Sequence, residues 1–594
     1  HVDLPFGTIA LGGGVERPGE LAPVPALQGV AVLGAQVRGK DQGEGQEDGG
    51  LVHEGVSFCL WWKAKGSAVP GKSKEPQPSL VICVDHPVHP LSVVYQMKKP
   101  CILFSLLLSG LCAFAKPNFV VVLVDDHAFE AISAYGTYLK DFAKTPAIDR
   151  LGKEGMRFDE FTCANSICSP SRASILTGQY SHKNGVTGLN GKINDDSPQY
   201  PVELRKAGYQ TWLVGKWHLN SAPKGYAKHM VVKGQGKYFD PTFNGSEGTW
   251  KREGYSTDVY TDVAMDWLKK RDPDKPFLLC LQFKAPHHDY GHAARYDKLL
   301  ADVTAPEPPS LYEDLRAGNS NLKKEFLRRT KFHMLHSGGN PNQQAEGDAY
   351  YFRHLKDGPP NQMWKHDPKS DKDRIRVAYQ HMIHKYVRCV KGNDDNLKRV
   401  LDYLDREKLT RDTVVIYTSD QGYWLGQHGF YDKRLILETS VRMPFLIRYP
   451  RLIKPGSVNS DLCINVDLAP TLLELAGVKA PAAMQGRSLL PLLKGKTPAD
   501  WRKSQFYSYW GAPNHYGIRT ERYTYLKLAG HPPELFDRQL DPTQSLNVAG
   551  EPDNKPILER LEKELTRQIR VVDISDSELP ASTRDEKKRR KPKH

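Results

Sequence analysis

The sequence is poor in cysteine, and its cysteines are not arranged for metal binding. Only 9 of the 594 residues are cysteine. Those beyond residue 115 are Cys163, Cys168, Cys280, Cys389 and Cys463, an odd number. They show no set of paired cysteines typical of a zinc site, so the pattern does not predict a structural metal held by cysteine. At least one thiol is also left without a disulfide partner.

The sequence also lacks internal repeats and a hydrophobic run long enough to span a bilayer. The candidate run, MKKPCILFSLLLSGLCAFAK, extends from Met97 to Lys116. Its apolar part is shorter than the ~20 residues that a membrane helix needs. The early lysines, the apolar centre and the final Ala-Phe-Ala are typical of a secretory signal peptide. We expect cleavage of residues 97–115 after Ala115, no stable membrane insertion afterwards, and a secreted or periplasmic protein.

Residues 1–96 lack sustained helix or strand periodicity and are rich in glycine, as in LGGGVERPGE and GKDQGEGQEDGG. A secretory signal acts at an N-terminus. We therefore expect Met97 to be the true start of the protein and residues 1–96 to be a non-native N-terminal extension.

The charge balance is basic, with a formal net charge of +14. Nucleic acid, an anionic membrane and a sulfated glycan are all suitable partners for such a chain. No recognised nucleic-acid-binding motif accompanies the charge, so we expect no nucleic-acid partner. Part of the excess lies at residues 576–594, which end in RDEKKRRKPKH and which we expect to form a disordered basic tail.

Beyond residue 116, apolar strand-like runs alternate with amphipathic helical segments. Strand-like runs occur in NFVVVLVDDH (118–127), PFLLCLQFKAPHH (276–288) and TVVIYTSDQG (413–422), and helical patterns in TPAIDRLGKEGMRF (145–158), YPVELRKAGYQTWLVGKWHL (200–219, helix then strand), DVAMDWLKK (262–270) and HKYVRCVKGNDDNLKRVLDYLDREKL (384–409). The alternation predicts an α/β fold with a doubly wound, mixed but mostly parallel sheet over residues 116–490.

The C-terminal part has a different pattern. Short aromatic-rich segments, SQFYSYWG (504–511), YGIRTERYTYLKL (516–528) and ELFDRQ (534–539), precede the helical PILERLEKELTRQIR (556–570). They predict a smaller antiparallel-sheet domain over residues 491–575. A polar insertion from about Leu311 to Asp371 interrupts the larger domain, and we expect it to act as a lid over the substrate cleft.

Polar side chains follow two of the predicted strands directly. Asp125 and Asp126 end the first strand, and Asp420 and Gln421 follow the last. Ligands of open α/β sheets bind beyond the carboxyl ends of the strands, where these groups can converge. Paired aspartates at a strand end are also common as helix caps, so this pattern alone leaves metal binding open.

The string Cys168-Ser169-Pro170-Ser171-Arg172, followed by ASILTG, resembles the signature of the sulfatase family. The resemblance covers Lys116 to about Arg570. It implies an alkaline-phosphatase-like fold and a cysteine that a separate formylglycine-generating enzyme oxidises to Cα-formylglycine, whose hydrated aldehyde is the nucleophile. Cys168 is therefore expected to be a precursor.

The same resemblance implies a divalent cation. Calcium prefers a cage of oxygen ligands, which the chain offers at Asp125, Asp126, Asp420 and Gln421, together with the matured residue 168. Many family members have asparagine where this chain has Gln421, whose carbonyl oxygen remains a suitable ligand.

Further basic residues match the family pattern: Arg172, Lys216, His218, His287 and Lys433. Lysine and arginine can orient anionic oxygens, and histidine can move protons. By resemblance, His218 partners the formylglycine hydroxyl, while His287 and Lys433 serve the leaving group. Lys216, His287, Lys433 and His515 are the predicted substrate contacts.

The predicted function is hydrolysis of sulfate esters of a sulfated polysaccharide or glycosaminoglycan-like sugar, because several segments are similar to bacterial N-acetylglucosamine-6-sulfatase-like enzymes. A phosphodiesterase or phosphonate monoester hydrolase of the same superfamily is the alternative. A non-catalytic protein that holds sulfated glycan is a third reading, which the convertible Cys168 disfavours.

Overall fold

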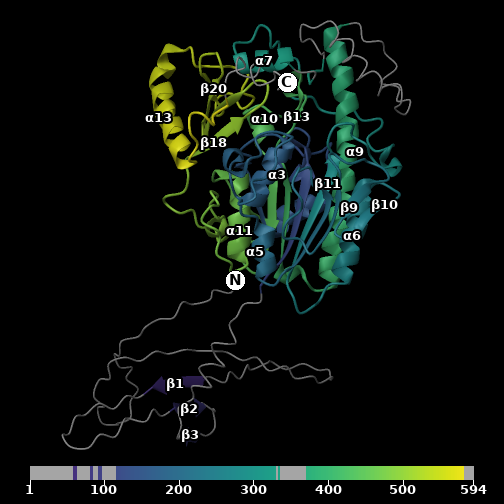
Figure 1. Cartoon of the computed structure of the whole chain (residues 1–594), viewed down its shortest axis with the longest axis vertical. Helices are drawn as coiled ribbons and strands as arrows, with labels where there is room; N and C mark the ends of the chain where they lie inside the picture. Colours follow the sequence, from purple (N-terminus) through teal and green to yellow (C-terminus); the bar gives the residue numbers. More distant parts are fainter. Residues whose placement is uncertain are drawn as a thin grey trace, which may run out of the picture. The chain divides into compact units, whose positions relative to one another are not determined.

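The computed structural model describes residues 116–329, 332–334 and 370–580, and three short strands before them (Figure 1). The chain divides into two compact units, His1–Phe114 and Ala115–His594. In the first unit β1 (Phe58–Trp62), β2 (Leu80–Val84) and β3 (Leu91–Tyr95) form an antiparallel sheet in that order. Two predicted segments lie outside the described residues: the signal peptide (97–115) and the basic tail from residue 581. The interpretation of these segments stays a prediction, as does that of residues 1–96.

A ten-stranded sheet forms the centre of the second unit, in the order β10-β9-β8-β7-β11-β4-β12-β15-β5-β16. The strands are β4 (Asn118–Asp125), β5 (Met156–Phe158), β7 (Gln210–Lys216), β8 (Lys228–Val232), β9 (Thr242–Gly245), β10 (Gly248–Lys251), β11 (Phe277–Pro286), β12 (Thr413–Ser419), β15 (Phe445–Arg448) and β16 (Ser457–Asn459). In this sheet β9 and β15 run against the other strands. The predicted mixed, mostly parallel sheet is confirmed.

Helices cover both faces of this sheet (Figure 1). Alternate residues of β4 point to opposite faces, so that Phe119, Val121 and Leu123 share one core with α3, α5 and α11, while Val120, Val122 and Val124 share another with α2, α6 and α9. These helices are α2 (Pro146–Glu154), α3 (Cys168–Thr177), α5 (Tyr200–Lys206), α6 (Ser256–Lys269), α9 (Asp371–Arg406) and α11 (Leu468–Leu475). The doubly wound arrangement is therefore present.

The long helix α9 begins earlier than its sequence pattern indicates. Its N-cap is Ser370, whose hydroxyl accepts a hydrogen bond from the Asp373 N–H at 3.2 Å. The polar insertion before it is described up to α7 (Asn321–Arg329) and residues 332–334. The remainder of the predicted lid lies outside the described residues.

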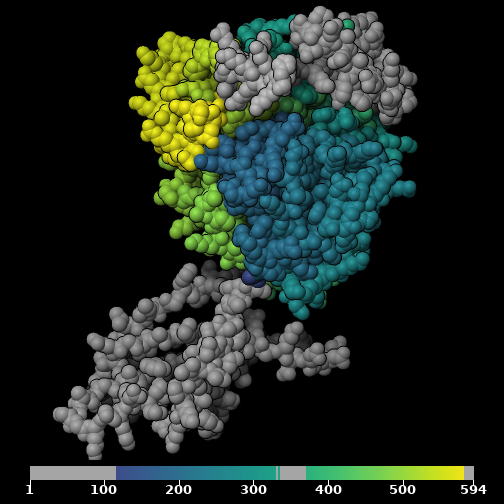
Figure 2. Space-filling model, viewed as in Figure 1, coloured from purple at the N-terminus to yellow at the C-terminus, as the bar shows by residue number. Residues whose placement is uncertain are grey.

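A smaller antiparallel sheet follows, in the order β18-β19-β20-β21, with strands Ser504–Tyr509, His515–Thr520, Tyr523–Leu528 and Glu534–Asp537. Helix α13 (Lys555–Val571) packs on it through Leu561 and Leu565. Figure 2 shows this C-terminal segment in yellow next to the blue segment, which contains His182. The two segments are in contact, because the His182 imidazole lies 2.9 Å from the Val572 carbonyl oxygen. The predicted antiparallel domain is confirmed.

None of the helices in the described part of the chain is long and apolar enough to cross a membrane.

Candidate active site

The site is built where the central strands β4 and β12 end. These neighbours are parallel, with Ser419 in register with Val124, so the acidic residues after each strand meet at one edge of the sheet. The Asp126 N–H donates a hydrogen bond to Asp420 Oδ1 at 3.1 Å. Asp126 has φ of 65°, in the left-handed region that non-glycine residues rarely adopt. Such local strain is typical of functional sites.

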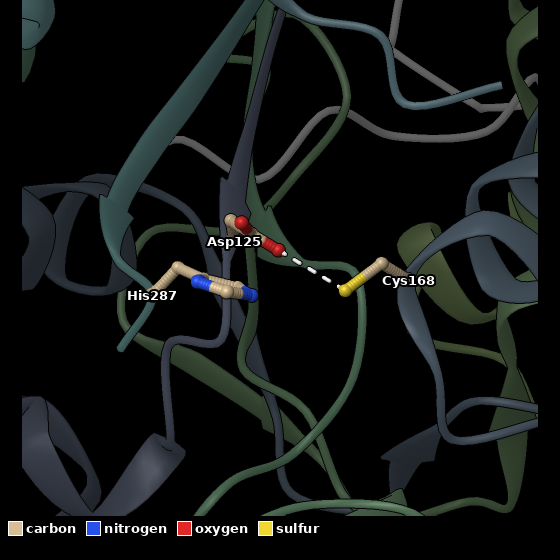
Figure 3. A group of neighbouring side chains, drawn as sticks. All are labelled: Asp125, Cys168 and His287. Atoms are coloured by element: carbon tan, nitrogen blue, oxygen red, sulfur yellow. Dashed lines mark hydrogen bonds between the residues drawn. The ribbon is translucent and has the colours of Figure 1, made fainter. Parts of the chain in front are cut away.

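Helix α3 presents Cys168 to these carboxylates. Cys168 is the first residue of the helix, and its Sγ lies 3.4 Å from Asp125 Oδ1. Figure 3 shows the Asp125 carboxylate pointing to the thiol, with His287 approaching from the opposite side. Pro170 falls within the first helical turn, where a missing N–H costs nothing, and Gly178 ends the helix in the left-handed conformation with φ of 65°. The motif therefore fixes the start and the end of the helix that carries the thiol.

The buried side chain of Arg172 connects α3 to the central sheet by hydrogen bonds. Its Nε donates to Asp420 Oδ2 at 2.9 Å, and its Nη1 donates to the Lys216 carbonyl oxygen at 2.7 Å and to Gln282 Oε1 at 3.1 Å. The guanidinium thus links the end of β7, the middle of β11 and the residue that follows β12. A lysine could not reproduce this fork of donors.

Two lysines pair with the first two carboxylates. Lys216 Nζ contacts Asp125, and Lys433 Nζ donates to Asp126 Oδ2 at 2.6 Å. Gly215 allows β7 to deliver Lys216, since a Cβ at this position would lie 1.9 Å from the Gln282 carbonyl oxygen. All three carboxylates of the cluster, at positions 125, 126 and 420, are fully buried.

Burial and neighbouring charges shift the pKa values of these three carboxylates in different directions. Burial opposes the ionisation of Asp125, but Lys216, His287, Arg172 and Lys433 overcome it and hold the pKa of Asp125 well below its ordinary value. Burial raises the pKa of Asp126 to about 7, and burial together with the charge of Asp125 raises the pKa of Asp420. Without a bound cation the cluster therefore retains protons near neutral pH.

The two predicted catalytic histidines lie at this cluster. His218 has φ of 52°, and its buried Nδ1 has no hydrogen-bond partner among the described residues. Burial, and then the charge of Lys216, lowers the pKa of His218 to about 3. His287 Nε2 lies 3.7 Å from Asp126 Oδ2, and burial lowers the pKa of His287 well below its ordinary value. Both rings are therefore neutral at pH 7 in the unliganded protein.

The donor set fits a hard divalent cation. Carboxylate oxygens of Asp125, Asp126 and Asp420 all lie within 4.8 Å of one another. The Gln421 side chain lies beside them: its Nε2 contacts Asp126, while its buried Oε1 has no partner in the described part of the chain. A buried carbonyl oxygen without a donor is costly, and a cation bound there would satisfy it. The oxygen-rich set favours calcium or magnesium over zinc.

Two residues that the sequence left unassigned also lie close to the cluster. A ring nitrogen of His288 lies within 4.8 Å of ligand atoms of Asp126 and His287. Lys284 lies on β11, three positions before His287, and is 4% exposed. The sequence offered only their position beside His287 as a signal, and an adjacent position does not fix where a side chain points.

The prediction of His515 as a substrate contact is wrong in this structure. His515 begins β19 and is 1% exposed. Its Nε2 accepts a hydrogen bond from the Ile436 N–H at 3.0 Å, and its Nδ1 lies 2.7 Å from the Pro513 carbonyl oxygen. Both ring nitrogens therefore bind backbone, and His515 holds the loop that follows Lys433.

A separate cavity of about 1350 Å³ lies between α13 and the smaller sheet. Trp501, Arg560 and Arg567 are among its lining residues, and no residue of the predicted site lines it. Its size therefore says nothing about the chemistry of the cluster.

Comparison with known proteins gives the family. The sulfatase family model matches residues 117–478, and the model of the N-sulphoglucosamine sulphohydrolase C-terminal region matches residues 426–571. The N-acetylglucosamine-6-O-sulfatase of Bacteroides thetaiotaomicron is 35% identical over 503 residues, covering 78% of this chain and 88% of the relative. Human N-acetylglucosamine-6-sulfatase is 29% identical over 428 residues, covering 67% of this chain and 68% of the relative.

Solved structures agree. A protein in complex with its substrate D-glucosamine-2-N,6-O-disulfate superposes with a TM-score of 0.71 at 34% identity, covering 78% of this chain and 99% of the other. The phosphonate monoester hydrolase of Silicibacter pomeroyi superposes with a TM-score of 0.59 at 22% identity, covering 76% of this chain and 95% of the other, which shows the shared fold. The expected alkaline-phosphatase-like fold is confirmed, and the chain belongs to the sulfatase family.

Proposed function

We propose that this protein hydrolyses sulfate esters of a sulfated, glycosaminoglycan-like sugar, with Cα-formylglycine made from Cys168 as the nucleophile. The observation that carries the proposal is the convergence of the Cys168 thiol and the carboxylates of Asp125, Asp126 and Asp420 at one edge of the sheet, with the Gln421 side chain beside them. Sulfatase membership gives this arrangement its chemistry.

The relatives support a hexosamine substrate. The bacterial relative is named for removal of sulfate from the 6-position of N-acetylglucosamine, and the superposed structure holds a glucosamine disulfate. A 6-sulfated N-acetylglucosamine or glucosamine unit is therefore the proposed substrate. Binding of a repeating anionic chain is also consistent with the net charge of +14.

Asp125, Asp126, Asp420 and Gln421 would hold one calcium ion together with the matured residue 168. The bound ion would polarise the sulfate group and favour the ionised form of the hydroxyl nucleophile. Lys216 pairs with Asp125, and Lys433 pairs with Asp126. These ion pairs hold both lysines beside the proposed position of the sulfate group.

The basic residues bind and orient the sulfate. Lys216 and Lys433 supply charged donors, and the α3 N-terminus adds the partial positive charge of its dipole at residue 168. Arg172 acts as a positioning residue, because its three hydrogen bonds fix Asp420 and the end of β7. These positively charged groups stabilise the negative charge that develops on the sulfate in the transition state.

The two histidines are proposed to transfer protons during the reaction. His218 is neutral and keeps Nδ1 unbonded, so it suits a base that takes the proton of the nucleophilic hydroxyl. His287 is neutral without substrate, but an anion bound beside it raises its proton affinity. His287 is therefore proposed to acquire a proton on substrate binding and to donate it to the leaving sugar oxygen.

Maturation requires a formylglycine-generating enzyme as a partner before the site becomes buried. In the folded chain Cys168 is 1% exposed, so an oxidising enzyme would meet the segment in an unfolded or nascent state. The predicted signal at 97–115 supports a secreted or periplasmic location for the mature protein.

The proposal is tested by measuring sulfate release from N-acetylglucosamine 6-sulfate. The comparison substrates are a phosphodiester and a phosphonate monoester, assayed with the same preparation. We expect kcat/KM on the sulfate ester to exceed that on either phosphorus substrate by at least about 100-fold. A preference for a phosphorus substrate would overturn the proposal in favour of the alternative hydrolase.

A further inference from the structure

The described chain contains four lysines that are almost fully buried, and one of them differs from the others. Lys216 pairs with Asp125, Lys433 with Asp126, and Lys323 with Glu313. The ammonium group of the fourth, Lys284, forms no ion pair or hydrogen bond with any described residue, although only 4% of this residue is exposed.

Lys284 makes one specific contact. Its Nζ lies 4.7 Å from the centre of the Tyr238 ring, a cation–π distance. The Tyr238 hydroxyl in turn contacts the carbonyl oxygen of His287. The ring thus supports the ammonium group and the backbone of a predicted catalytic residue together, but it supplies no negative charge.

The place of Lys284 connects it to the site. On β11, Gln282 accepts a hydrogen bond from Arg172, and residues two apart on a strand point to the same side. The charges that act most strongly on Lys284 are those of Lys216, Asp125, Asp289 and Asp126.

Burying a cation without an anion is expensive, and replacing such a lysine with an apolar residue would ordinarily stabilise a protein. The buried charge of Lys284, beside a proposed sulfate-binding site, is explained if a sulfate group of the bound substrate is its partner. We propose that Lys284, supported by Tyr238, is a further substrate-binding residue whose ammonium group contacts a sulfate oxygen of the bound sugar. This inference rests on the proposed function.

The contacted oxygen belongs either to the sulfate that is removed or to a second sulfate on the same sugar. The two sources differ in their substrate dependence. Loss of Lys284 would weaken turnover of every sulfate ester in the first case, and of doubly sulfated sugars alone in the second.

The test uses Lys284→Met, with Lys323→Met as the control. Kinetics are measured on an aryl sulfate, N-acetylglucosamine 6-sulfate and glucosamine 2-N,6-O-disulfate, and Tm is measured with and without inorganic sulfate. We expect kcat/KM of the Lys284 variant to fall about tenfold or more on at least the disulfate, as for a lost charge-assisted hydrogen bond. An equal fall on all three substrates assigns the contact to the transferred sulfate.

Stability separates binding from packing. Lys284→Met should keep or raise the Tm of the sulfate-free protein, whereas Lys323→Met should lower it because Glu313 loses its partner. Sulfate should raise the Tm of the wild-type protein more than that of the Lys284 variant, and this readout needs no turnover. A wild-type protein without activity would refute the proposed function, while the sulfate shift would still decide the role of Lys284.

Two results would overturn the inference. One is kcat/KM within about twofold of wild type on all three substrates together with an unchanged sulfate shift. The other is a fall in Tm of the sulfate-free Lys284 variant as large as that of the control, which would make the lysine a packing element.

Discussion

At the scale of single residues, one thiol is chemically distinguished from its neighbours. Cys163 and Cys168 are five positions apart and both fully buried, yet only the second contacts a carboxylate of the cluster. Burial raises the pKa of both thiols. Neither thiol is therefore a thiolate near neutral pH, and Cys168 itself is a poor nucleophile until it is converted.

Replacement of Cys168 by alanine should abolish turnover and leave the fold intact, because the nucleophile is lost while the side-chain volume changes little. We expect kcat to fall by at least about 10³-fold, with Tm within about 3 °C of wild type. The matched control is Cys163→Ala, which should retain activity. Alanine at position 168 with activity within tenfold of wild type would rule out the proposed nucleophile.

At the scale of elements, strand ends and loop junctions hold the site together. The ends of β4 and β12 carry the acids, and the cation that they would bind competes with protons. Burial raises the pKa of Asp126 to about 7, so the metal-free site takes up protons as the pH falls through that value.

Calcium should therefore raise the Tm more at pH 8 than at pH 6. An acid whose folded pKa is raised makes the metal-free protein less stable as pH rises from its unfolded pKa to about 7, so chelated protein should also lose Tm over this range. Thermal unfolding with calcium or with chelator at each pH measures both effects. Full activity and an unchanged melting curve after exhaustive chelation at pH 8 would contradict the metal assignment.

A second junction joins three segments through Glu313. This carboxylate lies 2.6 Å from His428 Nδ1, 2.9 Å from Lys323 Nζ and 2.7 Å from the Ser545 hydroxyl. Burial opposes its ionisation, but His428 and Lys323 lower the pKa of Glu313 to about 2. It thereby ties the start of the insertion to the loop after β12 and to the C-terminal domain.

Glu313→Gln should destabilise the protein by about 1–3 kcal/mol at neutral pH, because Lys323 is left buried without its anion. A folded pKa below the unfolded value stabilises the protein above about pH 4.5, and this contribution is lost as the pH falls toward about 2. The difference in Tm between wild type and variant should therefore shrink in acid. The control is Glu253→Gln, at an exposed position, which should show little effect at any pH. A Glu313 variant with a constant Tm difference from pH 7 to pH 3 would refute this role.

The elements that the sequence predicted best were those with continuous apolar runs. β4, β11 and β12 are long and buried on both faces. Asp125 is the last residue of β4 and Asp420 directly follows β12, so the sequence placed both aspartates at the same edge of the sheet. The sequence did not predict β5, β15 and β16, because strands of three or four residues leave no periodicity to detect.

Side-chain direction was the part of the site that the sequence could not supply. Lys284 and His288 flank the predicted His287, but the sequence cannot show that one is a buried cation without an anion. His515 was misassigned because its partners are backbone groups of Ile436 and Pro513, which leave no sequence pattern.

At the scale of the whole molecule, the two sheets share one hydrophobic core. Leu123 of β4, Ala173 of α3, Phe506 of β18 and Leu561 of α13 belong to the same buried cluster. The second compact unit begins at Ala115, next to the predicted cleavage position. We propose, from the predicted signal peptide, that the mature protein needs nothing before Lys116.

A chain that begins at Lys116 should therefore fold, be active and unfold in one transition, with Tm within about 2 °C of the full chain. N-terminal sequencing of secreted material should return Lys116 as the first residue. A secreted protein that begins within the first ninety residues would show that the N-terminal segment is native.

The central claim, that Cys168 is matured into the nucleophile of a sulfatase, is tested most directly by the mass of the tryptic peptide Phe158–Arg172. This peptide also contains Cys163, which serves as an internal control for thiol labelling. We predict that in active protein Cys163 is alkylated, while residue 168 has lost its thiol, carries an aldehyde and reacts with a hydrazide. Full sulfatase activity in protein whose two cysteines are both alkylated as thiols would contradict the account.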